Sequence, residues 1–128
     1  MSLTPAQQKI ISDFAEANKH WPKPQLEGAL WQIKWQLQAL PHQKEPDDGE
    51  YDTFLMLAGR GSGKTHTASH WIGIRAWNHD NTRWLVTAPT SNDIRATCFE
   101  GDSGLLNVIP QSIIRDYNKS LFEITLIN

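Results

Sequence analysis

A glycine-rich segment restricts the possible folds more than any other feature of this sequence. Residues 58–65 read AGRGSGKT, after the apolar run 53–57 and before a stretch with helical character. Glycine allows the backbone to wrap closely and to adopt positive φ angles, so that several N–H groups can point at one centre. A helix that follows adds unpaired N–H groups and the positive end of its dipole. The segment therefore predicts a phosphate-binding loop between a strand and a helix.

The last two residues of this segment supply the groups that a nucleoside triphosphate and its metal ion require. Lys64 provides a mobile charge for the β- and γ-phosphates, and the hydroxyl of Thr65 is a ligand for Mg²⁺. A dinucleotide fingerprint is excluded, because it requires glycine at Lys64 or His66. The predicted cofactors are ATP and Mg²⁺. The predicted phosphate cradle consists of Ala58, in the position where the strict pattern has glycine, and of Gly59, Arg60, Gly61, Ser62 and Gly63.

Apolar periodicity and turn residues predict the order α-α-β-α-β-α-β-β along the chain. Thr4 and Gln7 form a capping box, with Pro5 at the first helical position. The β-α-β order in the middle favours a parallel sheet. The predicted helices run from the Thr4 cap to about Asn18, over 25–39, over 64–78, and from a Ser91 or Asn92 cap to Phe99, with a half-turn at 105–109. The predicted strands cover 53–57 and 84–88. A predicted hairpin joins two short runs near 113–114 and 121–127.

Two tryptophans lie beside the apolar stripe of the second predicted helix. Trp31 and Trp35 are four residues apart, next to a stripe in which leucine or isoleucine recurs at spacings of four and three. They could form a stacking platform for bases. Packing against the next layer of the fold is the favoured interpretation.

Composition limits the class of protein. The net charge is −2, and no cluster of basic residues indicates nucleic-acid binding. Cys98 is the only cysteine, which excludes an internal disulfide and favours a reducing compartment. No apolar run is long enough to span a membrane, so we expect a cytoplasmic protein without membrane contact. Five acids fall within residues 45–52, a run typical of a solvated loop: Glu45, Asp47, Asp48, Glu50 and Asp52.

Three quoted segments carry a resemblance to a known family. LAGRGSGKT (57–65), WLVTAPTSNDIRATCFEGDSGLL (84–106) and LPHQ (40–43) resemble motifs in the N-terminal part of the phage terminase large subunit. This family contains the ATPases that package DNA into viral capsids. The resemblance implies an ASCE-type P-loop NTPase fold, here an incomplete parallel sheet flanked by helices. A helical extension with a possible adenine motif would cover residues 1–44, and a partial P-loop ATPase core would cover 45–128.

The same resemblance implies roles for single residues. Arg60 matches a P-loop arginine that reaches toward the γ-phosphate, so that Arg60 and Lys64 are the catalytic candidates. Gln43 would read the adenine edge, and Thr65 would hold the metal. A surface salt bridge for Arg60 and a plain loop position for Gln43 remain alternatives. For four further residues the resemblance implies only that they match the family pattern, without a specific role. A structural role in helix caps and local ion pairs is the favoured interpretation for them: Asp93, Arg95, Glu100 and Ser103.

The resemblance also implies partners, namely double-stranded DNA, a small terminase subunit and a capsid portal, and a homo-oligomeric ring. Hydrolysis in such a motor requires a carboxylate pair after a later apolar strand. Neither Asp102 nor Glu123 has the apolar-apolar-apolar-apolar-Asp-Glu context of that pair. We therefore expect a viral or prophage fragment that binds ATP–Mg²⁺ weakly and does not turn it over.

Other functions remain open at this stage. A helicase-like translocase would share the P-loop and the TAPT strand end, and a truncated remnant could bind nucleotide without catalysis. A nucleotide kinase is disfavoured, since 57 residues precede Ala58. With so few sheet strands, we expect faces of Trp71, Trp77 and Trp84 to be exposed and the chain to self-associate.

Overall fold

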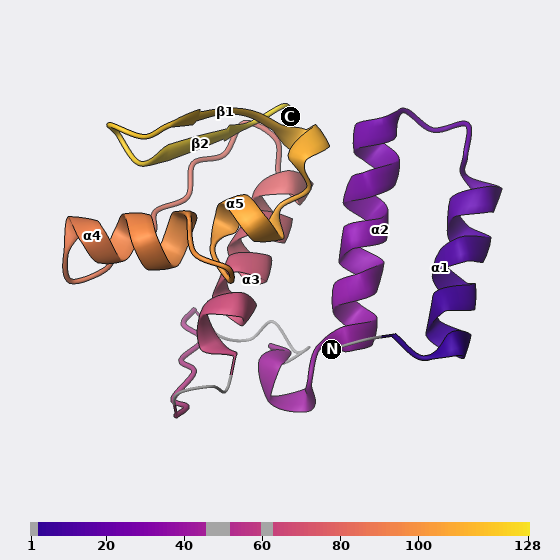
Figure 1. Cartoon of the computed structure of the whole chain (residues 1–128), viewed down its shortest axis with the longest axis horizontal. Coiled ribbons are helices and arrows are strands. Elements are labelled where there is room, and N and C mark those ends of the chain that lie inside the picture. Colours follow the sequence, from indigo (N-terminus) through magenta and orange to yellow (C-terminus); the bar gives the residue numbers. More distant parts are fainter. Residues whose placement is uncertain (1–2, 46–51, 60–62) are drawn as a thin grey trace.

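Two antiparallel helices begin the chain and lie side by side (Figure 1). The computed structural model describes residues 3–45, 52–59 and 63–128. Helix α1 (Pro5–Ala17) starts at the predicted capping box: Thr4 Oγ1 accepts from Gln7 N at 3.2 Å, and Gln7 Oε1 accepts from Thr4 N at 3.0 Å. The helix ends at Asn18 as predicted.

Helix α2 (Lys23–Gln38) lies between α1 and α3 and buries its tryptophans. Trp31 and Trp35 are only 7% and 9% exposed, which confirms the packing interpretation. The predicted leucine and isoleucine stripe is half-buried up to Leu37. Gly28 is required by a close approach, because a Cβ there would lie 2.4 Å from the indole nitrogen of Trp77.

Helix α3 (Lys64–Asn78) has the predicted bounds and packs between α2 and α5 (Leu105–Val108). A short 3₁₀ turn, η1 (Pro41–Gln43), links α2 to the segment that precedes the glycine loop. The core lies between α2, α3 and the C-terminal third of the chain. It is formed by the buried residues Trp31, Phe99, Leu105, Ile109 and Ile113.

The C-terminal third contains short elements and a hairpin. Helix α4 (Ser91–Asp93) continues into the π-helical turn η2 (Ile94–Phe99), and η3 (Gln111–Ile113) precedes β1 (Ile114–Asn118). Strand β2 (Glu123–Leu126) pairs antiparallel with β1, with Tyr117 opposite Ile124, so the predicted hairpin is confirmed. The cap of α4 is Thr90 rather than Ser91 or Asn92.

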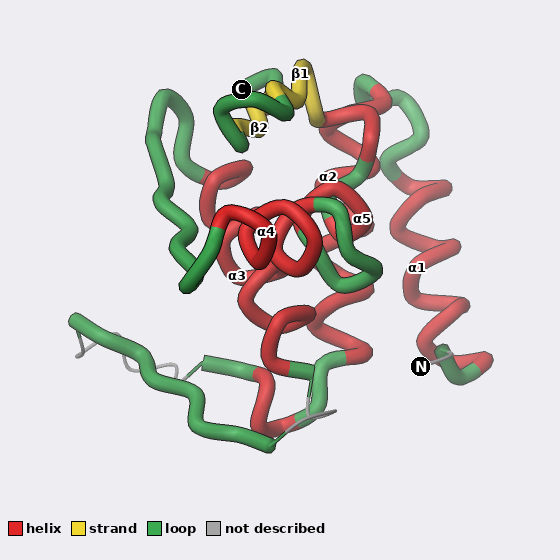
Figure 2. The backbone as a smooth tube through the Cα atoms, turned by 60° about the vertical axis from the view of Figure 1, so that its left-hand side comes forward, coloured by secondary structure: helices red, strands yellow, loops and turns green. Residues whose placement is uncertain are grey.

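The structure corrects the two strands predicted at 53–57 and 84–88. Both segments lie outside regular secondary structure and appear as loops in Figure 2, and the only sheet among the described residues is the β1–β2 pair. A strand is stabilised by hydrogen bonds to a neighbouring strand, and within the described part of the chain neither segment belongs to a sheet. The parallel sheet therefore stays a prediction. None of the described helices is long and apolar enough to cross a membrane.

Candidate nucleotide-binding site

Lys64 lies at the junction between the glycine loop and α3. Its ammonium group donates a hydrogen bond of 2.6 Å to the carbonyl oxygen of Ala58. This contact joins Lys64 to Ala58, the first residue of the predicted cradle. No carboxylate among the described residues pairs with this lysine. The charged group therefore stays within the loop, where an incoming anion would meet it.

Gly63 makes the turn from the loop into the helix. Its φ of 84° lies in the left-handed region, which favours glycine. Its carbonyl oxygen accepts from the backbone N–H of Thr67 at 2.9 Å and from the Thr67 hydroxyl at 2.8 Å. A Cβ at this position would lie 2.4 Å from Nε2 of Gln43. The backbone conformation thus favours glycine at the end of the loop, and the Gln43 amide occupies the space that a side chain at this position would enter.

Gln43, the candidate adenine reader, is 7% exposed and lies against the same glycine. Its Oε1 accepts from the backbone N–H of Leu40 at 2.9 Å, and its Nε2 makes a long contact of 3.5 Å with Gly63 O. The side chain therefore connects the LPHQ turn to the glycine loop. Its role toward adenine stays a prediction.

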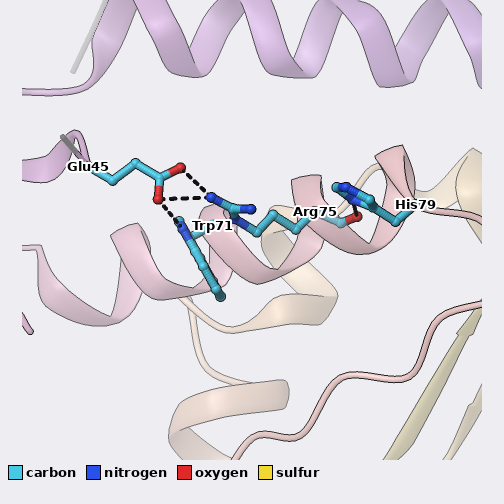
Figure 3. A network of polar contacts seen from close by, with 4 residues as sticks. All are labelled: Glu45, Trp71, Arg75 and His79. Carbon is cyan, nitrogen blue, oxygen red and sulfur yellow. Dashed lines mark hydrogen bonds and ion pairs between the residues drawn. The ribbon is translucent and has the colours of Figure 1, made fainter. Parts of the chain in front are cut away.

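Glu45, two residues after Gln43, joins a polar network with side chains of α3 (Figure 3). The Glu45 carboxylate accepts from Arg75 Nη2 at 2.8 and 3.0 Å and from the indole N–H of Trp71 at 2.9 Å. The Arg75 guanidinium also lies 4.6 Å from the centre of the Trp71 ring. The prediction of a solvated acidic loop is therefore wrong for Glu45, because an arginine and an indole bind its charge.

The structure describes only some of the remaining candidate ligand residues. Arg60, Gly61 and Ser62 lie outside the described residues. At Gly59, no atom of the described residues beyond its chain neighbours lies within 4 Å of the position that a Cβ would occupy. Thr65 is half-buried in the first turn of α3, and its hydroxyl makes no hydrogen bond within the described part of the chain. The same part contains no group of three or more metal-ligating side chains.

Sequence reasoning missed an aromatic cluster behind the first turns of α3. The rings of His70 and Trp35 stack with centroids 4.0 Å apart, and the ring of His66 meets that of Trp35 edge-on at 5.6 Å. Burial lowers the pKa of His70 to about 4, although its hydrogen bond to the His66 carbonyl acts in the opposite direction. The signal was present as two pairs at helical spacing, Trp31 with Trp35 and His66 with His70.

Among the four residues named after position 90, two make contacts that are local in sequence. Asp93 pairs with Thr90 at the helix start, and Arg95 donates to Asn92 at 2.9 Å. The carbonyl of Ser103 accepts from the Ser69 hydroxyl of α3 at 2.7 Å. The position of Asp93 at the α4 cap agrees with the favoured interpretation, whereas no ion pair of Asp93, Arg95 or Glu100 is found within the described part of the chain, and the Ser103 contact joins residues 34 positions apart. The four residues lie on α4–η2 and the loop beyond it, apart from the glycine loop (Figure 1).

Comparison with protein-family models, with curated proteins and with solved structures found no match for this chain.

Proposed function

We propose that this chain is the ATP-binding portion of a DNA-packaging motor of the terminase large-subunit type, and that residues 58–65 bind ATP with Mg²⁺. The contact of 2.6 Å between the Lys64 ammonium and the Ala58 carbonyl carries the proposal. It places a cation across the ends of a glycine loop at the start of a helix. A phosphate group that displaces this carbonyl would gain a charge-assisted hydrogen bond without a large movement of the lysine.

The described residues agree with the chemistry of the ligand. The left-handed turn at Gly63 directs the chain into α3, so the positive end of the helix dipole faces the loop. Thr65 offers an uncommitted hydroxyl to Mg²⁺. Bound ATP would supply the free energy of phosphoanhydride hydrolysis. The residues of this chain would bind and orient the triphosphate.

The fold and location belong to the same proposal. The two extended apolar segments 53–57 and 84–88 flank α3 in sequence, as the strands of a parallel P-loop sheet would. We propose that they adopt this pairing when a neighbouring strand is supplied. A cytoplasmic location, DNA, a small terminase subunit, a portal and a ring assembly follow from this function.

Titration with a fluorescent ATP analogue in the presence of Mg²⁺ tests the proposal. Lys64→Ala should weaken binding by at least about tenfold, because a hydrogen bond to a charged group contributes about 1.5–3 kcal/mol. Lys34→Ala is the matched control, since this lysine is exposed on α2, away from the loop, and should leave the affinity unchanged. Equal affinities of the Lys64→Ala variant and the unsubstituted chain would contradict the proposal.

A turnover assay separates a motor from a binding protein without catalysis. These 128 residues contain no apolar strand that ends in Asp-Glu, so we expect hydrolysis near background. Hydrolysis well above background that disappears in Lys64→Ala would show that other carboxylates activate water.

A further inference from the structure

The segment around η1 contacts the α3 region at two places. At the first, Gln43 Nε2 meets the carbonyl oxygen of Gly63, directly before α3, at 3.5 Å. At the second, the Glu45 carboxylate binds side chains of Trp71 and Arg75, about two helical turns further along α3 (Figure 3). The contact at the predicted phosphate loop is therefore the long one, and the contact away from the loop consists of short hydrogen bonds.

The Glu45 contact is the firmer of the two attachments. Its oxygens accept from Arg75 Nη2 at 2.8 and 3.0 Å and from the Trp71 indole at 2.9 Å. The Glu45 and Arg75 side chains are 29% and 37% exposed, so water screens their attraction less than it would on an open surface. Trp71 and Arg75 are four residues apart on one face of α3, with the guanidinium 4.6 Å from the ring centre. The carboxylate thus meets two donors that the helix already holds together.

A firmly held Glu45 restricts the position of Gln43. Two residues of chain span at most about 7 Å, so Gln43 cannot move far while Glu45 is bound to α3. The Gln43 side chain is 7% exposed and fills the space beside Gly63, whose φ is 84°. The Gly63 carbonyl also accepts from the N–H of Thr67 at 2.9 Å, which makes it part of the first turn of α3. Gln43 therefore supports the end of the glycine loop and the start of the helix together.

We propose that Glu45 is a positioning residue for the phosphate-binding loop. Its bonds to the two α3 side chains hold Gln43 against Gly63 and so preserve the left-handed turn into Lys64. Glu45 acts through Gln43 and not through contact with the nucleotide. The expected effect on ATP rests on the proposed function, whereas the holding contact itself can be measured without nucleotide.

Hydrogen–deuterium exchange in the absence of nucleotide tests the holding contact. Glu45→Gln should speed the exchange of two N–H groups at least about threefold: that of Gln43, which donates to Leu40 O, and that of Thr67, which donates to Gly63 O. The N–H groups of α1 should exchange as in the unsubstituted chain. A change confined to the two ends of the contact distinguishes positioning from a general loss of stability.

Two further variants complete the exchange measurement. Arg75→Gln should produce the same local change, because it removes the cationic partner whichever acid of residues 45–52 pairs with it. Asp13→Asn is the matched control, since it breaks an ion pair of 2.8 Å with Lys9 on α1 and should leave the exchange around η1 and Gly63 unchanged.

Titration with a fluorescent ATP analogue and Mg²⁺ tests the consequence for the loop. Glu45→Gln and Arg75→Gln should each weaken binding about three- to fivefold, and the double variant should bind no more weakly than either. Gln43→Ala should also weaken binding, and Glu45→Gln added to it should cause no further loss, because the effect passes through Gln43. Circular dichroism checks that every variant is folded under the conditions of the titration.

Several outcomes would overturn the assignment. These are exchange that is unchanged or that rises evenly over α1 to α3 in Glu45→Gln and Arg75→Gln, and the same local change in Asp13→Asn. Undiminished ATP affinity of the Glu45→Gln variant, or a full additional loss in the Gln43→Ala background, would also overturn it. If the unsubstituted chain binds no ATP but the local change in exchange is found, the proposed function fails and the holding role of Glu45 stands.

Discussion

The helical layer and the two extended segments beside it use apolar residues in opposite ways. In the helical layer, Trp31 and Trp35 are 7% and 9% exposed. In the extended segments, Leu57 is 85% exposed and Leu85 is 83% exposed. The two regions have similarly apolar sequences, but only one buries them.

The difference follows from where each element finds its hydrogen bonds. A helix satisfies its backbone groups within a few residues of sequence, so α2 and α3 form and pack from their own patterns. A strand needs a neighbour for its backbone groups and for one or both faces. Beside residues 81–86, a groove of about 750 Å³ still reaches the core residues Phe99, Leu105 and Ile109. The core is thus closed on its helical side and open beside the extended segment.

Replacing one tryptophan in each region should give the largest difference in the free energy of unfolding between the two regions. Trp31→Ala should lower the free energy of unfolding by about 3–5 kcal/mol, since it removes a buried aromatic side chain from the core cluster. Trp84→Ala removes a side chain that is 39% exposed and should cost much less. Urea denaturation followed by circular dichroism measures both values.

A second variant keeps this comparison measurable if Trp31→Ala does not fold. Trp31→Phe keeps an aromatic ring and should still destabilise more than Trp84→Phe. Equal losses at the two positions would mean that the extended segment is as well packed as the helical layer.

A fall in pH should lower the free energy of unfolding because of His70 in the helical layer. Burial against Trp35 lowers its pKa from 6.5 to about 4 in the folded chain, so the unfolded chain takes up a proton first as the pH falls. The contribution to stability is complete above about pH 6.5 and is lost between about pH 6.5 and 4. It amounts to at most about 3–4 kcal/mol, at about 1.4 kcal/mol per pKa unit.

The measurement is the free energy of unfolding between pH 7 and 4. His70→Gln should flatten this profile, whereas His20→Gln, at an exposed position between α1 and α2, should leave its shape unchanged. A profile of the unsubstituted chain that does not fall below about pH 6.5 would contradict the role given to His70.

The elements that could be predicted from sequence are those with local signals. Thr4, Pro5 and Gln7 marked the start of α1, and the GKT sequence marked the first residue of α3. The segments 53–57 and 84–88 carried equally clear strand patterns. The pattern of a strand says that its side chains suit a sheet, but whether a partner strand is present depends on other parts of the molecule.

The candidate site also combines features that have a local sequence signal with contacts between residues far apart in the sequence. The left-handed conformation of Gly63 and the start of α3 at Lys64 followed from the glycine pattern, whereas the ligand roles of Lys64 and Thr65 stay predictions. The contact of Gln43 with Gly63 and that of Glu45 with Arg75 join residues 20 and 30 positions apart. Long-range contacts of this kind depend on how α2 and α3 cross. A run of acids therefore predicted a solvated loop where Glu45 has a specific partner.

Charges on the extended segments should change association while leaving stability nearly unchanged. Leu57→Lys combined with Leu85→Lys alters side chains that are 85% and 83% exposed, so the free energy of unfolding should change by less than about 1 kcal/mol in total. The unsubstituted chain should self-associate in size-exclusion chromatography through its exposed apolar segments, and the double variant should elute closer to a monomer. Ile10→Lys is the matched control, because Ile10 is 50% exposed on α1 and should not alter the elution volume. A sharp monomer peak for the unsubstituted chain, or an equal shift in Ile10→Lys, would mean that the extended segments do not drive association and that the two regions differ less than their exposures indicate.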